Sequence, residues 1–177
     1  MTTNDILKKF TLEGDIALVT GASRGLGRRF ACVLANMGAK VVLAARNKEK
    51  LNETKNIITA SGGDCCIIEM DVTNEKSIYA GFEEAKEKLG NVNILINNAG
   101  IAIAKSSINT SMDDWNSVIN TNLSAVFACS KVFAKNLIDK NLPGKIINIS
   151  SIASEIVLGK YLSSYCSSNM KSTFIFH

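Results

Sequence analysis

A glycine-rich segment near the N-terminus constrains the fold of this chain more than any other feature. Residues 20–27 read TGASRGLG. The apolar run at residues 15–19 comes directly before the segment and predicts a short buried strand. After the segment, apolar residues recur at helical spacing, namely Phe30, Val33, Leu34 and Met37. The glycines are therefore expected to lie in a turn between a strand and a helix.

The spacing of the three glycines suits the binding of a dinucleotide. Gly21 permits a tight turn, Gly25 lets a diphosphate approach the backbone, and Gly27 lets the helix pack closely on the sheet. The helix N-terminus then offers unpaired N–H groups and the positive end of the helix dipole to phosphate groups. A plain strand-to-helix turn is the alternative. The residues of this segment predicted to bind the cofactor are Gly21, Ser23, Arg24, Gly25, Leu26 and Gly27.

Two other kinds of site match part of this segment, and the sequence excludes both. Residues 21–25 fit the G-x-S-x-G pattern of a nucleophilic serine. That chemistry needs a histidine base, and the single histidine of the chain is its last residue, His177. The phosphate-binding loop of NTPases requires a Gly-Lys-Ser/Thr sequence, which does not follow Gly21.

Length and composition predict a single globular domain over residues 1–177. The chain is long enough for a sizeable core, and 46% of its residues are hydrophobic and 20% charged. The net charge is +4 and the lysines are scattered, which favours a solvated surface over a nucleic-acid-binding stripe. No apolar run reaches membrane-spanning length. The sequence thus predicts neither a nucleic acid nor a membrane as a partner.

The N-terminal residues and the cysteines predict a cytoplasmic location. Residues 1–15 are polar and lack the apolar stretch of a signal peptide. Five cysteines, an odd number without a secretory signal, indicate reduced and buried thiols. Cys65 and Cys66 are expected to point to opposite faces of a strand. The sequence shows no spacing typical of a metal site.

Strands and helices alternate along the rest of the chain. Further strands are predicted at residues 40–45, 65–70, 93–96 and 145–149, and helices at residues 48–60, 75–89 and 112–139. The helix residues expected to be buried are Leu51, Ile57, Ile58, Trp115, Val118, Ile119, Val126, Phe127, Val132 and Phe133. Right-handed crossovers between parallel strands then give an α/β, Rossmann-like doubly wound sheet of order 3-2-1-4-5. Its ligand crevice is expected at the carboxyl edge, where the first strand meets the fourth.

The end of the second predicted strand favours NADP over NAD as the cofactor. A site selective for NAD would carry Asp or Glu there, to hold the ribose hydroxyls. This strand instead ends in Arg46, and Arg24 lies in the glycine segment. Two guanidinium groups suit a 2′-phosphate. The alternative is that Arg46 is only a solvated residue at the end of a strand.

Several motifs occur in one order along the chain. They are residues 20–27, Asp71-Val72, Asn97-Asn98-Ala99-Gly100, Trp115 seven residues before Asn122-Leu123, and Asn148-Ile149-Ser150-Ser151. Together they resemble the short-chain dehydrogenase/reductase family, in particular its 3-oxoacyl-acyl-carrier-protein reductase and glucose dehydrogenase type members. The resemblance covers residues 13–168, nearly the whole chain.

The resemblance implies roles for residues of the cofactor site. Asp71 and Val72 would contact the adenine of NADP. Asn98, Ala99 and Gly100 would line the nicotinamide side.

The resemblance also implies the catalytic residues. Ser151 would hydrogen-bond the substrate oxygen, Tyr165 would be the general acid/base, and Asn122 would hold a water of the proton relay. The reaction would be hydride transfer between the nicotinamide and a carbonyl or secondary alcohol of a small molecule. The protein would supply one proton.

One position departs from the family pattern. In the family, a lysine four residues after the tyrosine lowers the tyrosine's pKa and holds the nicotinamide ribose. Asn169 stands at that position here and supplies no positive charge. Lys171 lies about 240° round the helix from Tyr165, and the interval from Ser151 to Tyr165 is one residue longer than expected. Two functions therefore stay open, an NADP-dependent oxidoreductase and a non-catalytic NADP-binding remnant or inactive fragment.

The length of the chain also departs from the family. Its members run to about 250 residues and continue into a sixth strand, a substrate-covering loop and a seventh strand. We expect this chain to lack those strands, either as a truncated form or as an intended short form. The fifth strand would then be an apolar edge, stability would be marginal, and the homo-oligomers typical of the family would be weakened.

Overall fold

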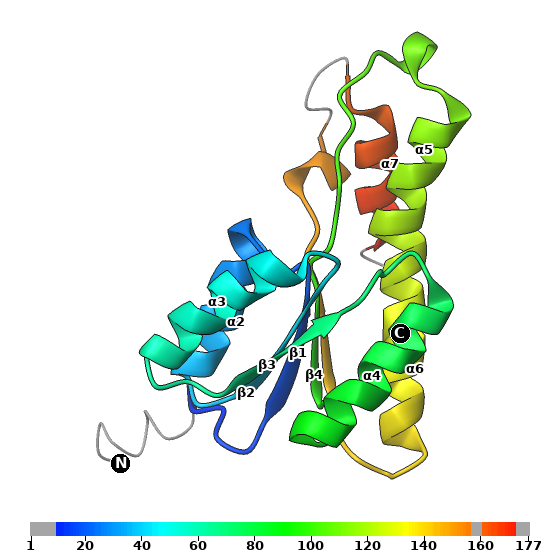
Figure 1. The fold of residues 1–177 in the computed structure, drawn as a ribbon. Coiled ribbons are helices and arrows are strands. Elements are labelled where there is room, and N and C mark those ends of the chain that lie inside the picture. The colour runs from blue at the N-terminus through cyan, green and yellow to red at the C-terminus, as the bar shows by residue number, and fades with distance from the viewer. Residues whose placement is uncertain (1–9, 157–160, 173–177) are drawn as a thin grey trace.

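The described residues form one parallel sheet with helices on both faces. The computed structural model describes residues 10–156 and 161–172. Its five strands are β1 (Ile16–Thr20), β2 (Lys40–Ala45), β3 (Cys65–Glu69), β4 (Ile94–Asn97) and β5 (Lys145–Asn148). They pair in the order β3-β2-β1-β4-β5 (Figure 1). The predicted strand order and doubly wound architecture are confirmed.

The apolar runs of the sequence form the centre of the sheet. Strand β1 pairs in parallel with β2 and β4, so that Val19 lies opposite Leu43 on one side and Ile96 on the other. All three side chains are buried. Strands covered on both faces must be apolar almost throughout, which explains why these runs do not alternate with polar residues.

The helices cover the sheet in two layers. On one face lie α2 (Gly25–Asn36) and α3 (Lys48–Ala60), and on the other lie α4 (Glu75–Leu89) and α6 (Ala125–Ile138) (Figure 1). Each layer has its own core, one including Ala31 and Leu51, the other including Phe82 and Phe133. Cys65 belongs to the first core and Cys66 packs against the second, which confirms their predicted opposite orientation.

The helix predicted at residues 112–139 has three parts. α5 (Met112–Ile119) passes through a π-helical segment, η3 (Asn120–Ser124), into α6. α7 (Ser163–Ser172) packs beside α5 and η3 (Figure 1). A π turn holds one more residue than an α turn, and such turns are frequent at functional sites. The sequence pattern predicted the continuous helical path, but it carried no signal for the π segment.

Several helix residues are more exposed than predicted. Phe127 is 52% exposed and Ile57 is 45% exposed, so both predictions of burial are wrong. In α3 the buried positions are Leu51, Thr54 and Ile58, a stripe that leaves Ile57 about 100° to one side. In α6, Phe127 likewise stands beside the buried stripe rather than on it.

The buried face of α2 also differs from the predicted pattern. It consists of small residues, namely Gly27, Ala31 and Ala35. Two of the larger apolar residues, Val33 and Met37, are exposed on the outer face. Small side chains let the helix axis approach the sheet closely, which is what the glycine turn requires. Among the predicted buried thiols, Cys65 and Cys129 are buried, whereas Cys32, Cys66 and Cys166 are half-buried.

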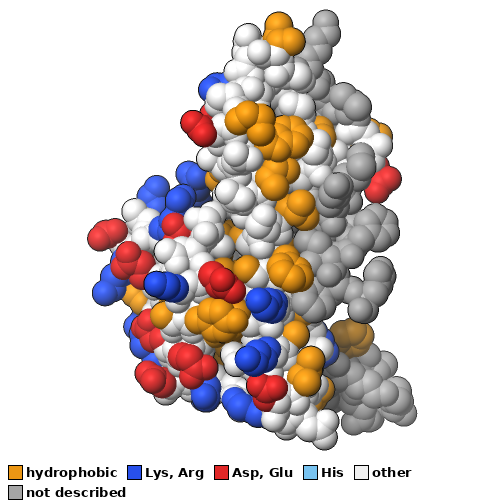
Figure 2. Space-filling model, turned by 90° about the vertical axis from the view of Figure 1, so that its right-hand side faces the viewer, with side chains coloured by type: hydrophobic (Ala, Val, Ile, Leu, Met, Phe, Trp, Pro, Cys, Tyr) orange, Lys and Arg blue, Asp and Glu red, His pale blue; other side chains and the backbone are white. Residues whose placement is uncertain are grey.

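Apolar side chains are exposed on the side of the molecule formed by α5 and α6. Figure 2 shows hydrophobic side chains along the length of this face, and Met112, Phe127 and Ile138 are among the exposed ones. Strand β5 pairs with β4 alone within the described residues, and its Ile147 is 49% exposed. An apolar edge at β5 was expected, and a role of the helical face in oligomers stays a prediction. None of the described helices is long and apolar enough to cross a membrane.

Candidate functional site

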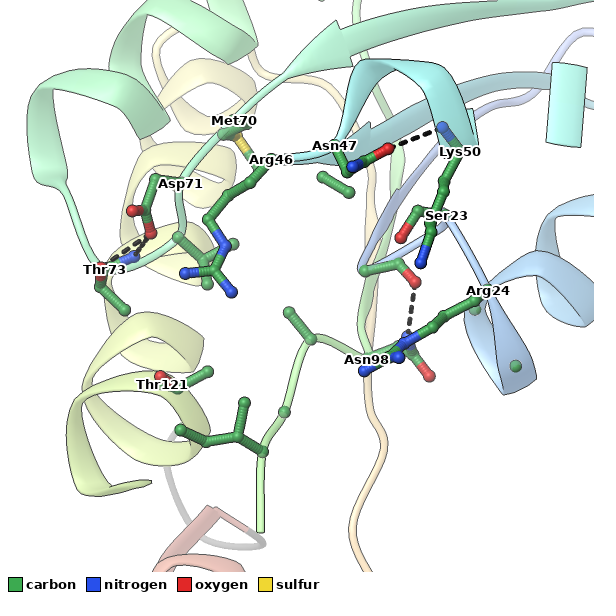
Figure 3. A pocket seen from close by; sticks show the side chains of 18 of the residues that line it. Ser23, Arg24, Arg46, Asn47, Lys50, Met70, Asp71, Thr73, Asn98 and Thr121 are labelled. Atoms are coloured by element: carbon green, nitrogen blue, oxygen red, sulfur yellow. Dashed lines mark hydrogen bonds between the residues drawn. The ribbon is translucent and has the colours of Figure 1, made fainter. Parts of the chain in front are cut away.

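A cleft of about 750 Å³ opens at the carboxyl ends of the strands. It lies where β1 meets β4, as predicted, and its walls come from the glycine turn, the ends of β2 and β3, the segment after β4, and η3 (Figure 3). The structure brings together every residue predicted to bind the cofactor: Gly21, Ser23, Arg24, Gly25, Leu26, Gly27, Arg46, Asp71, Val72, Asn98, Ala99 and Gly100.

Two glycines of the turn are required by close packing. Gly21 has φ = 67°, and a Cβ there would lie 3.0 Å from both the Ala99 Cα and the Asn98 Nδ2. A Cβ at Gly27 would collide with the Gly21 carbonyl oxygen and lie 2.5 Å from the Asn98 Nδ2. The predicted tight turn and close helix–sheet packing are thus present. At Gly25 a Cβ would meet nothing within 4 Å, although its φ of 57° still favours glycine.

Thr20 and Asn98 join the two strands that form the crevice. The Thr20 hydroxyl oxygen accepts hydrogen bonds from the N–H groups of Asn98 (2.9 Å) and Ala99 (3.0 Å). The Asn98 side-chain amide donates to the Thr20 carbonyl at 2.9 Å. These bonds hold the end of β1 and the loop after β4 at a fixed spacing. Sequence reasoning assigned no role to Thr20, although its place at the end of a buried strand was a signal.

The N-terminus of α2 faces the cleft without a side-chain cap. Arg24 occupies the N-cap position and makes no capping hydrogen bond. In contrast, Asn47, Asn74 and Ser111 accept capping bonds at the starts of α3, α4 and α5. The first N–H groups of α2 are therefore available to an anion in the cleft, as its sequence predicted.

Three basic side chains surround the outer end of the cleft. Arg24 and Arg46 line it as predicted, and Lys50 joins them from the first turn of α3 (Figure 3). Sequence reasoning missed Lys50. A basic residue in the first turn after the second strand was the signal that could have found it, because the start of α3 must lie at the same edge as Arg46. Among the described residues, the acidic side chain that lines the cleft is Asp71, which comes from the loop after β3 rather than from the end of β2.

Asp71 lies on the loop after β3, in the wall of the cleft beside Arg46. Burial opposes ionisation of its carboxyl group, but hydrogen bonds from Thr73 and the positive charge of Arg46 leave its pKa below the usual range. The Asp71 Oδ1 accepts bonds from the Thr73 N–H (2.9 Å) and the Thr73 hydroxyl (2.7 Å). Asp71 is therefore a fixed, ionised acceptor in the wall of the cleft.

The predicted catalytic residues do not line this cleft. The Ser151 hydroxyl accepts a bond from the Ala153 N–H at 3.2 Å, and Tyr165 is half-buried on α7. Within the described residues, no hydrogen bond joins the Ser151 and Tyr165 side chains. His177 and the side chain of Lys171 lie outside the described part of the chain.

Asn122 links the cleft to α7. Its Oδ1 accepts from the Ile101 N–H (2.9 Å), and its Nδ2 donates to the Ile101 carbonyl (2.9 Å) and the Ser168 hydroxyl (3.1 Å). Both amide hydrogens are thus engaged with protein groups. The predicted role in holding a water would fall to the second lone pair of Oδ1.

Asn169 is directed into its own helix. Its Nδ2 donates to the Tyr165 carbonyl at 2.9 Å, and the residue is only 6% exposed. The side chain is close to Tyr165 as the spacing predicted, yet it does not line the cleft. Among the described residues, no cluster of three or more His, Cys, Asp or Glu side chains could hold a metal ion.

Comparison with known proteins identifies the family. The family model described as "short chain dehydrogenase" matches residues 15–171. The chain belongs to the short-chain dehydrogenase/reductase family. The resemblance predicted from the motifs is thus confirmed.

Individual relatives share much of the chain. It is 40% identical over 147 residues to gluconate 5-dehydrogenase of Gluconobacter oxydans, a match that covers 83% of this chain and 57% of that protein. It is 41% identical over 142 residues to 3-oxoacyl-[acyl-carrier-protein] reductase of Salmonella typhimurium, covering 80% and 57%. The solved gluconate 5-dehydrogenase of Burkholderia cenocepacia, in complex with NADP and tartrate, superposes with a TM-score of 0.86 at 32% identity, covering 93% and 64%. The chain therefore spans a little more than half the length of these curated relatives.

Proposed function

We propose that the cleft binds NADP(H) and that the chain is an NADP(H)-dependent oxidoreductase acting on a carbonyl or secondary alcohol. The observation that carries the proposal is the group of Arg24, Arg46 and Lys50 at the outer end of the cleft. Three positive charges suit a 2′-phosphate on the adenine-side ribose, whereas a site for NAD would present a carboxylate there. The NADP bound to the relative from Burkholderia cenocepacia supports this choice.

The remaining walls fit the other parts of the same cofactor. The open N-terminus of α2 and the turn at Gly25 would hold the diphosphate. Asp71 and Val72 would contact the adenine. Asn98, Ala99 and Gly100 would hold the nicotinamide half, at the end of the cleft nearest η3 and α7.

In this proposal the bound cofactor supplies the hydride and the protein supplies a proton. The Tyr165 hydroxyl would exchange that proton with the substrate oxygen, and the Ser151 hydroxyl would donate a hydrogen bond to the same oxygen. Asn122 would keep the loop at Ile101 in place beside α7, since its side chain bonds both segments.

A second candidate function is NADP(H) binding without turnover. The contacts of Asn169 favour it, because an uncharged side chain bonded to the Tyr165 carbonyl provides no cation for the tyrosine hydroxyl. The same side chain is buried and does not line the cleft, so it offers no contact to a ribose there.

Binding and turnover measured separately distinguish the two candidates. NADPH binding is followed by the emission of Trp115 and of the cofactor, and turnover is then assayed with acetoacetyl-type ketones, for the native chain and for Asn169→Lys. Turnover in the native chain supports the oxidoreductase. Binding without turnover, unchanged in Asn169→Lys, supports the non-catalytic candidate. Absence of NADPH binding contradicts both.

Three further expectations belong to this proposal. They are a single domain over residues 1–177, a cytoplasmic location, and a small-molecule carbonyl or alcohol as the substrate. A weakened homo-oligomer is also expected, and size-exclusion chromatography of the purified chain would measure its oligomeric state.

A further inference from the structure

We propose that Arg28 and Thr54 are positioning residues for the cofactor diphosphate. They act by hydrogen-bonding the backbone carbonyls of the glycine turn on the side away from the cleft. The inference rests on the proposed function, because it assigns the turn to the diphosphate. Neither residue lines the cleft, and neither was singled out by the sequence motifs.

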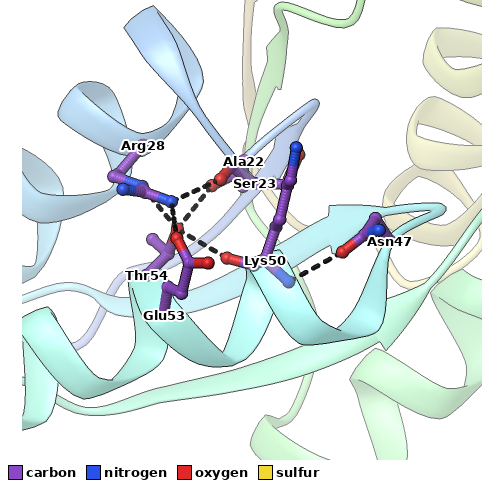
Figure 4. A network of polar contacts seen from close by, with 7 residues as sticks. All are labelled: Ala22, Ser23, Arg28, Asn47, Lys50, Glu53 and Thr54. Atoms are coloured by element: carbon purple, nitrogen blue, oxygen red, sulfur yellow. Dashed lines mark hydrogen bonds and ion pairs between the residues drawn. The ribbon is translucent and has the colours of Figure 1, made fainter.

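Arg28 reaches from α2 to both the turn and α3. Its Nη2 donates to the Ser23 carbonyl at 2.8 Å and forms an ion pair with the Glu53 Oε2 at 2.8 Å. Its Nε donates to the Thr54 hydroxyl oxygen at 3.1 Å. Figure 4 shows the guanidinium between the turn and the side chains of α3. Its planar fork is suited to bridging several acceptors at once.

Thr54 completes the network from inside the protein. Its side chain is fully buried, at 0% exposed. Its hydroxyl oxygen lies 3.0 Å from the Ala22 carbonyl and 3.3 Å from the Lys50 carbonyl, and it accepts the bond from Arg28. A buried hydroxyl at this point satisfies the Ala22 carbonyl, which would otherwise lack a side-chain partner away from water.

The two fixed carbonyls determine where the following N–H groups point. In a trans peptide unit the C=O and the next N–H lie on opposite sides. Bonds from α3 and Arg28 to the carbonyls of Ala22 and Ser23 therefore direct the N–H groups of Ser23 and Arg24 the other way. Within the described residues the Ser23 N–H has no hydrogen-bond partner, and the Arg24 N–H makes only the weak bond that closes the turn at residues 21–23. Ser23 and Arg24 both line the cleft, so these are donors for an anion bound there.

The network thus separates two parts of the cofactor site. Arg46 lies at the basic end and belongs to the 2′-phosphate. Arg28 and Thr54 affect the diphosphate site through the backbone of the glycine turn, and they do not line the cleft themselves. Substitutions of Arg28 or Thr54 should therefore leave unchanged the affinity for a ligand that carries only the 2′-phosphate.

Two ligands test this separation in the chain of residues 1–177 by titration calorimetry. 2′-Phospho-ADP-ribose carries both the 2′-phosphate and the diphosphate, whereas adenosine 2′-monophosphate lacks the diphosphate. Thr54→Val and Arg28→Met should each weaken binding of 2′-phospho-ADP-ribose about tenfold or more. Each should leave binding of adenosine 2′-monophosphate within about twofold of the native value. Thr54→Ser keeps the hydroxyl and should bind both ligands as the native chain does.

Matched controls come from the same two helices. Thr59→Val removes a hydroxyl whose partners among the described residues are the Lys55 and Asn56 carbonyls of its own helix. Arg29→Met removes an exposed charge next to Arg28. Both should bind the two ligands normally. Arg28 is partly exposed, at 29% of its side chain, so its variant should fold even where Thr54→Val does not.

The outcomes separate the inference from the proposed function. The positioning role would be overturned if Thr54→Val and Arg28→Met weakened the binding of both ligands equally, or weakened the binding of neither. The cofactor assignment would remain intact in both cases. Failure of the native chain to bind either ligand would overturn the proposed function itself, and the inference with it.

Discussion

The side chains of Thr20 and Asn98 are bonded to each other's backbone across the crevice. The Asn98 amide donates to the Thr20 carbonyl, and the Thr20 hydroxyl accepts from the Asn98 N–H, both at 2.9 Å. The β1–β4 strand pairing ends at Val19 and Ile96, and this reciprocal pair holds the loop after β4 to the end of β1 beyond that point. The cleft forms directly above it, between the glycine turn and the loop that begins at Asn98.

Thr20→Val should destabilise the protein by about 2–4 kcal/mol, because it leaves the N–H groups of Asn98 and Ala99 without an acceptor. The substitution keeps the shape of a side chain that is 1% exposed. The free energy of unfolding is measured with urea. Thr20→Ser retains the hydroxyl, and its cost should be limited to about 1 kcal/mol for the lost methyl group. Equal stability of the Val and Ser variants would contradict this account.

The sequence predicted those parts of the fold in which a local pattern of residues is compatible with a single structure. The apolar runs at β1, β2 and β4 are buried on both faces. A Cβ would be tightly crowded at Gly21 and would collide at Gly27. The order of parallel strands follows from right-handed crossovers. These constraints together placed every predicted cofactor residue in one cleft.

The parts that were not predictable depend on contacts between distant segments. Ile57 and Ile58 are equally apolar, but only Ile58 lies on the buried stripe of α3. That stripe includes the polar residue Thr54, whose hydroxyl bonds the Ala22 carbonyl of the glycine turn. The direction of the Asn169 side chain depends on a backbone acceptor within its own helix, which residue spacing does not reveal.

Arg46→Ala should change the choice between cofactors. In the proposed site its guanidinium contacts the 2′-phosphate, so the variant should bind NADPH about 10- to 100-fold more weakly and NADH within about twofold of the native value. Dissociation constants for both cofactors are measured by fluorescence titration. Lys48→Ala removes a nearby exposed charge that does not line the cleft and serves as the control. An equal loss of affinity for NADPH and NADH would show that Arg46 supports the structure of the site and does not select between the two cofactors.

Asp71 should make stability depend on pH on the acid side. Its folded-state pKa is below the ordinary value, since bonds from Thr73 and the charge of Arg46 outweigh the effect of burial. A carboxyl group of this kind stabilises the fold above its unfolded pKa of about 3.9, and the contribution is lost as pH falls through the folded-state pKa. Asp71→Asn should therefore be less stable than the native chain at pH 6, and the difference should shrink below about pH 4.

Urea unfolding of the native chain and of Asp71→Asn at a series of pH values measures this difference. Asp113→Asn is the control, because Asp113 is exposed and forms no ion pair within the described residues. At pH 6 this variant should lose less stability than Asp71→Asn does. A difference for Asp71→Asn that grew as the pH fell would contradict the assignment.

Two of the free cysteines should resist alkylation in the folded protein. Burial raises the pKa of the Cys129 thiol to about 12, and burial also raises that of Cys66 to about 11 although Lys88 opposes it. The thiolate is the reactive form, so at pH 8 Cys66 should carry about a hundredfold less of it than an ordinary thiol. Iodoacetamide labelling followed by peptide mass spectrometry should therefore modify half-buried Cys32 before Cys66 and Cys129. Equal labelling of all three in urea would confirm that the fold provides the protection, and rapid labelling of Cys129 without urea would show that the core around it opens.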